Sequence, residues 1–159
     1  MESTIEILNT EDDFGNKCER KYISMHTIDF EYSNQYVYRM EGFCVYLSFF
    51  PQSDMKQIRF SIVLYKYRRP LKFHNFPITV AFMVNNNKPV CLSTSWTTES
   101  SSFVLCENEY EQVIDAFKKN NKIRFIVKWV GSESKDFYDF TINYNKWTFN
   151  DCLKKLEKL

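Results

Sequence analysis

The chain contains few of the residues that interrupt regular structure, with three glycines and four prolines among its 159 residues. A linker, a collagen-like segment or a long disordered tail would require far more of both. The chain also lacks the run of roughly 18 apolar residues that a membrane-spanning helix needs. These absences predict one folded domain that does not span a membrane.

An excess of charge of one sign is also missing, because the chain has 21 basic and 20 acidic side chains. No net field would draw the protein toward nucleic acid or anionic lipid. The polar residues 1–6 do not have the pattern of a signal peptide. Without an export signal, the five cysteines are expected to be free thiols in the reducing cytoplasm. They are Cys18, Cys44, Cys91, Cys106 and Cys152.

Residues for acid–base or metal chemistry are scarce. The two histidines, His26 and His74, are expected on a strand face and in a loop. The chain contains no GxSxG, no HExxH, no glycine-rich phosphate loop and no CxxC pair. Cys44, Cys91 and Cys106 lie in apolar strands, where cysteine acts as a small core residue. We therefore expect no enzyme activity, no cofactor and no metal site.

Strand signals dominate what is present, since aromatic residues make up 18% of the chain. Residues 1–20 are polar and acidic, and they predict an arm with one short strand near residues 5–8. Residues 21–159 predict a single β-rich domain. Residues 43–50 are apolar at nearly every position, which indicates a strand covered on both faces. Residues 57–67 alternate between apolar and polar, as in a strand with one buried face.

The C-terminal half predicts further strands over residues 78–84, 90–96, 102–106, 123–130 and 137–142. Asn108 and Glu111 form a capping-box pattern that predicts one helix, and Asn145 or Thr148 caps a second. The expected fold is mostly β, a β-sandwich or a curled antiparallel sheet, with two short α-helices in the C-terminal half. The expected core there comprises Trp96, Phe103, Phe125, Val127, Phe140, Leu153 and Leu156.

Three segments of this half carry a family resemblance: ITVAFMVNNNKPVCLSTSW, SFVLCENEYEQVIDAFKKNNKIRFIVKWV and DFTINYNKWTFNDCLKKLEKL. About half of the chain resembles bacterial accessory β-domains tied to type VI secretion, of the TagO or VasI type. More loosely, it is similar to invasion-associated B-type proteins. The resemblance implies a β-rich fold, although those proteins are usually exported and carry a glycine where Tyr144 or Asn145 stands here. The matching positions are Phe82, Asn86, Trp96, Phe103, Phe117, residues 123–127, Phe140, Ile142, Leu153 and Leu156.

Residues 43–67 also resemble, more distantly, a MATH-type sandwich. The tryptophan-containing strand expected at the start of such a domain is absent from this chain.

Aromatic and arginine side chains that alternation leaves outward predict a partner-binding surface, because these residue types anchor interfaces. The predicted residues are Tyr36, Tyr38, Tyr65, Tyr67, Arg68, Arg69 and Lys72, and Tyr46 is also expected to face outward. A competing interpretation has such tyrosines cover a second sheet with their hydroxyls at its rim.

We expect a small non-enzymatic protein-binding module, acting as an accessory protein, inhibitor or scaffold. Its richness in Asn, Lys, Tyr and Phe is typical of AT-rich genomes and favours a microbial or viral origin. The alternative is a nucleic-acid-binding module, because residues 65–73 interleave aromatic and basic side chains that stack bases and contact phosphates.

Overall fold

The structure is a computed structural model of the chain. It describes residues 2–30, 43–51, 56–64, 69–70, 78–92, 94–95, 102–105, 107–129 and 137–158. Within these ranges the chain forms two antiparallel sheets and two helices, and both helices lie in the C-terminal half. The predicted fold class is therefore confirmed. The expected core residue Trp96 and the side chain of Phe103 lie outside the described part.

The larger sheet has seven strands in the order β1-β2-β3-β4-β9-β8, and β5 pairs with β4. Neighbouring strands are antiparallel throughout. The strands are β1 (Thr4–Glu11), β2 (Lys17–Phe30), β3 (Phe43–Phe50), β4 (Gln57–Leu64), β5 (Arg69–Pro70), β8 (Thr94–Ser95) and β9 (Ser102–Leu105).

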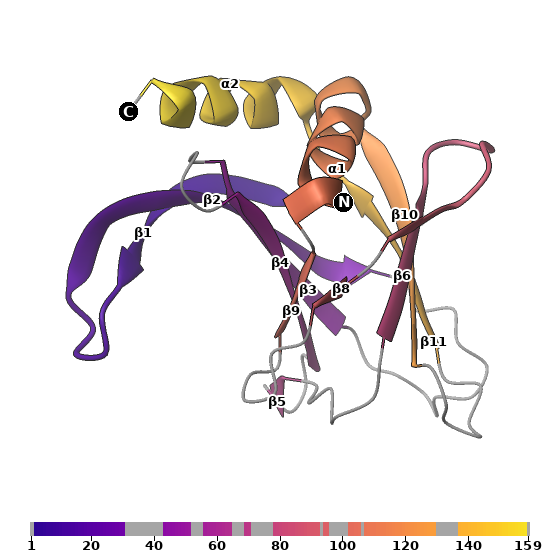
Figure 1. Ribbon diagram of the computed structural model, residues 1–159, viewed down its shortest axis with the longest axis horizontal. Coiled ribbons are helices and arrows are strands. Elements are labelled where there is room, and N and C mark those ends of the chain that lie inside the picture. The colour runs from indigo at the N-terminus through magenta and orange to yellow at the C-terminus, as the bar shows by residue number, and fades with distance from the viewer. Residues whose placement is uncertain are drawn as a thin grey trace.

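The smaller sheet has four strands in the order β11-β10-β6-β7. Its strands are β6 (Ile78–Met83), β7 (Val90–Leu92), β10 (Lys122–Trp129) and β11 (Phe137–Asn143). The helices are α1 (Glu107–Lys119) and α2 (Lys146–Glu157). Both helices lie on one side of the larger sheet, where α1 contacts β4 and α2 contacts β1 and β2 (Figure 1).

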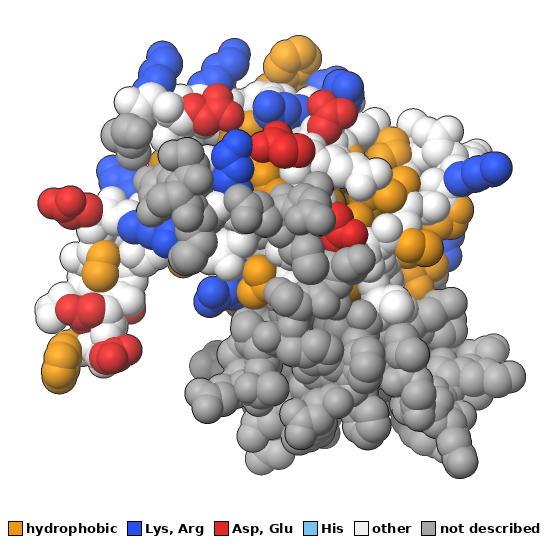
Figure 2. All heavy atoms as spheres, viewed as in Figure 1, with side chains coloured by type: hydrophobic (Ala, Val, Ile, Leu, Met, Phe, Trp, Pro, Cys, Tyr) orange, Lys and Arg blue, Asp and Glu red, His pale blue; other side chains and the backbone are white. Residues whose placement is uncertain are grey.

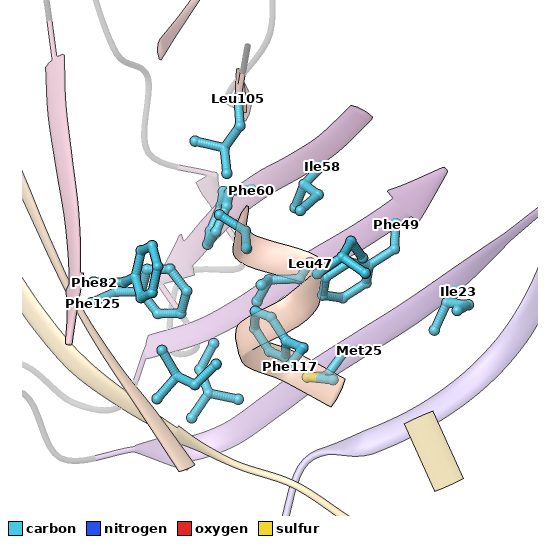
Figure 3. Close-up of a cluster of buried hydrophobic side chains, with 14 of the residues drawn as sticks. Ile23, Met25, Leu47, Phe49, Ile58, Phe60, Phe82, Leu105, Phe117 and Phe125 are labelled. Atoms are coloured by element: carbon cyan, nitrogen blue, oxygen red, sulfur yellow. The ribbon is translucent and has the colours of Figure 1, made fainter. Parts of the chain in front are cut away.

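The core lies where both sheets and both helices meet. Alternation in β10 buries Ile123, Phe125 and Val127, as the sequence predicted. An aromatic cluster then joins the layers through Phe49 of β3, Phe117 of α1, Phe125 of β10 and Phe149 of α2. The ring centroid of Phe49 lies 5.0 Å from that of Phe117 (Figure 3) and 5.1 Å from that of Phe149, and both contacts are edge-on. Such pairs add about 0.5–1.5 kcal/mol each beyond their buried area.

The prediction that residues 43–50 are covered on both faces is wrong at Tyr46 and Ser48. Tyr46 is 40% exposed and Ser48 is partly exposed, whereas Phe50 on the same face is buried, so the second face of β3 is only partly covered. The apolar sequence was misleading here because the Tyr46 ring stacks on the His26 ring of the neighbouring strand, at a centroid distance of 5.5 Å. With this contact, the Tyr46 ring needs no covering layer. The core-facing residues of the strand are Val45, Leu47 and Phe49.

Residues 1–20, expected as a polar arm, contain β1 and the beginning of β2. The strand expected near residues 5–8 spans Thr4–Glu11, and β2 already starts at Lys17, before the predicted start of the domain at residue 21. Ile5 and Ile7 alternate with polar residues and pack against the core, which explains the longer strand. The hairpin of β1 and β2 curls away from α2 and projects from the rest of the molecule (Figures 1 and 2).

Helix α1 begins at Glu107, two residues before the first helical residue expected after an Asn108 N-cap. Asn108 therefore lies in the first turn and is not the N-cap, so that prediction is wrong. For α2 the prediction holds, because the Asn145 side chain accepts hydrogen bonds from the backbone N–H groups of Trp147 and Thr148 at 3.0 and 3.1 Å.

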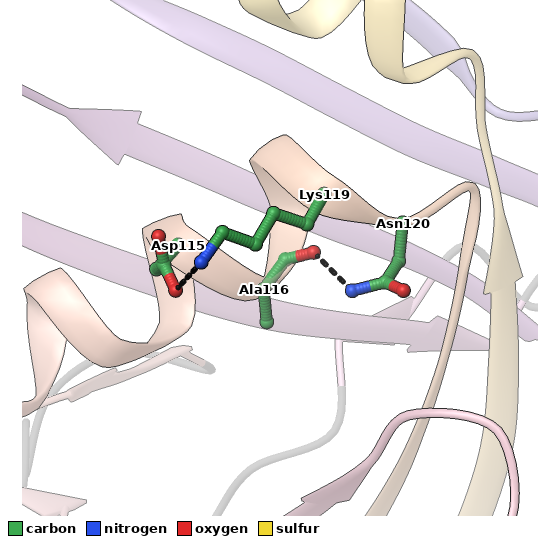
Figure 4. A network of polar contacts seen from close by, with 4 residues as sticks. All are labelled: Asp115, Ala116, Lys119 and Asn120. Atoms are coloured by element: carbon green, nitrogen blue, oxygen red, sulfur yellow. Dashed lines mark hydrogen bonds and ion pairs between the residues drawn. The ribbon is translucent and has the colours of Figure 1, made fainter.

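The C-terminal end of α1 is closed by side chains. The last four carbonyls of a helix have no partner within it. Asn120 Nδ2 donates to the carbonyl of Ala116 at 2.9 Å, beside the Lys119–Asp115 ion pair (Figure 4). Tyr144 Oη donates to the carbonyl of Phe117 at 3.0 Å. Asn150 Nδ2 of α2 donates to the carbonyl of Lys118 at 3.0 Å. Three carbonyls at the end of α1 therefore accept side-chain donors, two of which come from the last 16 residues of the chain.

Candidate functional site

Most residues of the predicted binding surface lie outside the described part of the chain. This applies to Tyr36, Tyr38, Tyr65, Tyr67, Arg68 and Lys72, and also to His74. Arg69 is the exception, because it forms β5 together with Pro70 and its backbone pairs with Leu64 of β4. The surface predicted from these residues, and the nucleic-acid-binding segment 65–73, remain predictions.

A second group of aromatic and arginine residues lies on the face of the larger sheet that is turned away from the helices. We call it the aromatic–arginine surface, and it comprises Arg20, Tyr22 and His26 of β2, Tyr46 and Phe50 of β3, and Arg59 of β4. Because the hairpin curls away from α2, this face lies on the inner side of the curve (Figure 1). Figure 2 shows the hairpin projecting from the rest of the molecule.

Strand alternation places these side chains together. Ile23 and Met25 of β2 are buried toward the core, so the even-numbered residues from Arg20 to His26 share the opposite face. The register then sets His26 beside Tyr46, and Ser24 beside Ser48. The signal was available in the sequence as R-x-Y-x-S-x-H, but the nearly continuous apolar run of β3 concealed which residues would meet it.

Phe50 is the base of this surface. Its ring is only 7% exposed, because neighbouring side chains on the same face cover it. The Tyr22 ring stacks on it at a centroid distance of 5.1 Å and an interplanar angle of 20°. The guanidinium carbons of Arg20 and Arg59 lie 5.2 and 5.9 Å from its centroid, within cation–π range. The two arginines are thus positioned by contacts within the sheet.

The His26–Tyr46 stack forms a second aromatic pair. Ser24 and Ser48 lie between it and the Tyr22–Phe50 pair, since residues two apart on a strand are separated by about 7 Å on one face. Small side chains thus separate two stacked aromatic pairs. Burial, followed by the charges of Glu11 and Glu6, raises the pKa of Tyr22 and keeps its phenol neutral and able to donate a hydrogen bond.

The tip of the hairpin carries an exposed aromatic side chain. Phe14 is 91% exposed. The turn beneath it is fixed, because Asp12 Oδ1 accepts hydrogen bonds from the N–H groups of Phe14 and Asn16, both at 2.9 Å. The bond from Asn16, together with that from Phe14, lowers the pKa of Asp12. Gly15 adopts a φ of 80°, which other residues rarely adopt. The tip thus presents a phenylalanine on an ordered acidic turn.

The cysteines only partly match expectation. Cys18, Cys91 and Cys152 are free thiols. Cys91 was expected in the core but is exposed, because β7 is an edge strand whose alternation turns Leu92 inward. No group of three or more His, Cys, Asp or Glu residues in the described ranges is arranged to hold a metal ion. The helices described here include none with the length and apolar character needed to cross a bilayer.

Arginine, tyrosine and histidine side chains have groups capable of stacking, hydrogen bonding and, for arginine, ion pairing. Comparison of the chain with protein-family models, with curated proteins and with solved structures found no match. The resemblance to type VI secretion accessory domains and to invasion-associated B-type proteins therefore stays a prediction, and the chain's own geometry is the basis for a functional proposal.

Proposed function

We propose that this protein is a small non-enzymatic binding module that engages a protein partner through the aromatic–arginine surface. The observation that carries the proposal is Phe50 with Tyr22 stacked on it and with Arg20 and Arg59 beside its ring. Aromatic residues and arginine are the types that supply most of the binding energy in protein interfaces.

Preorganisation supports this proposal. Ordering a long side chain at an interface costs about 0.5–1.5 kcal/mol. Arg20 and Arg59 already rest near an aromatic ring, so less of this cost remains when a partner binds. Their planar guanidinium groups are suited to bidentate contact with carboxylates, so the partner surface we propose is acidic.

The location and origin we propose follow from composition. The free thiols Cys18, Cys91 and Cys152 fit a reducing compartment such as the cytoplasm. The richness in Asn, Lys, Tyr and Phe fits an accessory factor, inhibitor or scaffold of a microbe or virus.

A charge reversal on the surface tests the proposal. A tagged chain is used to recover partners from host lysate at two salt concentrations, with mass spectrometry as the readout. The affinity of a recovered partner is then measured for Arg59→Glu and for Lys88→Glu, which makes the same charge change in the exposed turn after β6. We expect Arg59→Glu to weaken binding by about tenfold or more and Lys88→Glu to leave it unchanged.

Circular dichroism of both variants controls for folding. Equal affinity of the two variants would contradict the proposed surface. Recovery of nucleic acid alone, lost at the higher salt, would instead support the alternative function of residues 65–73.

A further inference from the structure

The larger sheet has a long open edge at β1. In the described part of the chain, β1 pairs with β2 alone, and β8 at the other edge has two residues. Six consecutive residues, 4–9, pair with β2 in unbroken register from Thr4↔His26 to Asn9↔Lys21. A register shift between Asn9 and Glu11 then ends the regular stretch. The bulge thus limits the usable edge to these six residues.

This stretch lacks the devices that usually protect an edge strand. Proteins block such edges with lysine, proline, bulges or charges that point inward. Residues 4–9 contain neither lysine nor proline, and their single charged residue is Glu6. Ile5 and Ile7 point inward and pack against the core while remaining partly exposed. An added strand would cover their exposed part.

We propose that the open edge of β1 binds an extended segment of a partner protein as an additional antiparallel or parallel strand, and that this segment alternates apolar and basic residues. Its apolar side chains lie beside Ile5 and Ile7 and extend the core, because side chains of neighbouring strands share faces. Its basic side chains lie beside Glu6 on the other face. This edge involves different residues from the aromatic–arginine surface and does not rest on the function proposed for it.

Charge determines which strand fits. Residues 2–13 contain five acidic side chains and no basic one. Pairing β1 with β1 of a second copy would bring these like charges together, which destabilises a strand pair. A basic segment is instead attracted to Glu6, the single charge of the regular stretch, and to the acidic residues that flank this stretch. The partner is therefore a basic extended peptide and not another copy of this chain.

The probe is a synthetic fluorescent peptide of alternating valine and lysine, as long as the regular stretch, and fluorescence anisotropy measures its binding to the full chain. Two further peptides carry N-methyl groups on one or the other alternate set of backbone amides. A strand that is bonded on one side uses one set only. We expect one of the two methylated peptides to bind about tenfold or more weakly and the other to keep its affinity. A tenfold change in affinity corresponds to about 1.4 kcal/mol of binding free energy.

Two more measurements complete the test. We expect hydrogen exchange to slow at residues 4–9 when the peptide is bound. We expect Glu6→Lys to lose the valine–lysine peptide and to bind a valine–glutamate peptide, whereas Arg59→Glu leaves peptide binding unchanged.

The proposal is overturned if the valine–lysine peptide does not bind or if both methylated sets bind equally. It is also overturned if the peptide slows hydrogen exchange only outside β1. A dimer of the chain that dissociates on Glu6→Lys substitution would overturn it too, because the edge would then bind a second copy.

Discussion

Two buried tyrosines provide a matched test of how hydroxyl groups contribute to this fold. Tyr144 is 1% exposed, and its hydroxyl donates to the carbonyl of Phe117 at 3.0 Å. Tyr110 is 3% exposed, and its hydroxyl has no hydrogen-bond partner among the residues that the structure describes. Replacing either residue by phenylalanine keeps the ring, so the packing is preserved and the hydroxyl alone is tested.

The expected effects have opposite signs. Tyr144→Phe removes one hydrogen bond and leaves the Phe117 carbonyl buried without its donor, which together cost about 2 kcal/mol. A chain of this size loses about 2–4 °C of melting temperature per kcal/mol, so Tm should fall by roughly 4–8 °C. Tyr110→Phe removes a buried hydroxyl whose desolvation is not offset, so the free energy of unfolding should stay the same or rise by about 1 kcal/mol.

Urea unfolding followed by circular dichroism measures both free energies, and an unchanged m-value shows that the compactness of the unfolded state is unaffected. The argument is refuted if the two variants lose the same stability. It is also refuted if Tyr144→Phe is neutral, because the Phe117 carbonyl would then not depend on this donor.

Three other predictions concern tyrosine titration, a helix cap and thiol reactivity. Burial raises the pKa of both Tyr110 and Tyr144, so the fold favours their neutral phenols; this contribution to the free energy of unfolding is present below about pH 10 and is lost as the pH rises further. In urea unfolding, the free energy of the Tyr110→Phe/Tyr144→Phe double variant should therefore depend less steeply on alkaline pH than that of the unmodified chain. An equal slope would count against this. Asn145→Ala should lower stability by about 1 kcal/mol through loss of the α2 N-cap, with an unchanged Tm as the contrary result. Iodoacetamide should modify the exposed Cys91 in the native protein and Cys152 only after unfolding, because Cys152 is buried and burial raises the pKa of its thiol. Peptide mapping measures the labelling, and equal labelling of the two cysteines in the native protein would disprove this prediction.

Much of the fold was predictable because local pattern and burial agree in the C-terminal half. The period-two alternation of β10 and the asparagine before α2 both lead directly to the observed elements. The errors occur where partners from elsewhere in the chain decide the outcome. Tyr46 faces outward as predicted, but the cover expected on both faces of residues 43–50 is missing there, because His26, twenty residues earlier, supplies a stacking partner. Cys91 is exposed because it lies on the face opposite the buried Leu92, and which face of the smaller sheet is covered depends on the other layers of the fold and not on the strand's own residues.

The candidate site was only partly predictable for the same reason. Composition pointed to aromatic and arginine residues as the binding groups, and the structure places such residues together on the larger sheet. Which ones meet depends on the register of β2 with β3 and of β3 with β4. Register is a long-range property that a one-residue slip would invert, so it could not be predicted from the strand sequences alone.

The closing of α1 by Tyr144, which follows β11, and by Asn150 of α2 has a consequence for synthesis on the ribosome. The donors Tyr144 and Asn150 follow their acceptors in the helix by 27 and 32 residues. The N-terminal segment depends on the same late region, because Ser3 N–H donates to the carbonyl of Asn143. The nascent chain thus carries the open end of α1 and an unanchored Ser3 until residues 143–150 have emerged. The aromatic core, which includes Phe149 of α2, stays incomplete over the same interval and must avoid aggregation.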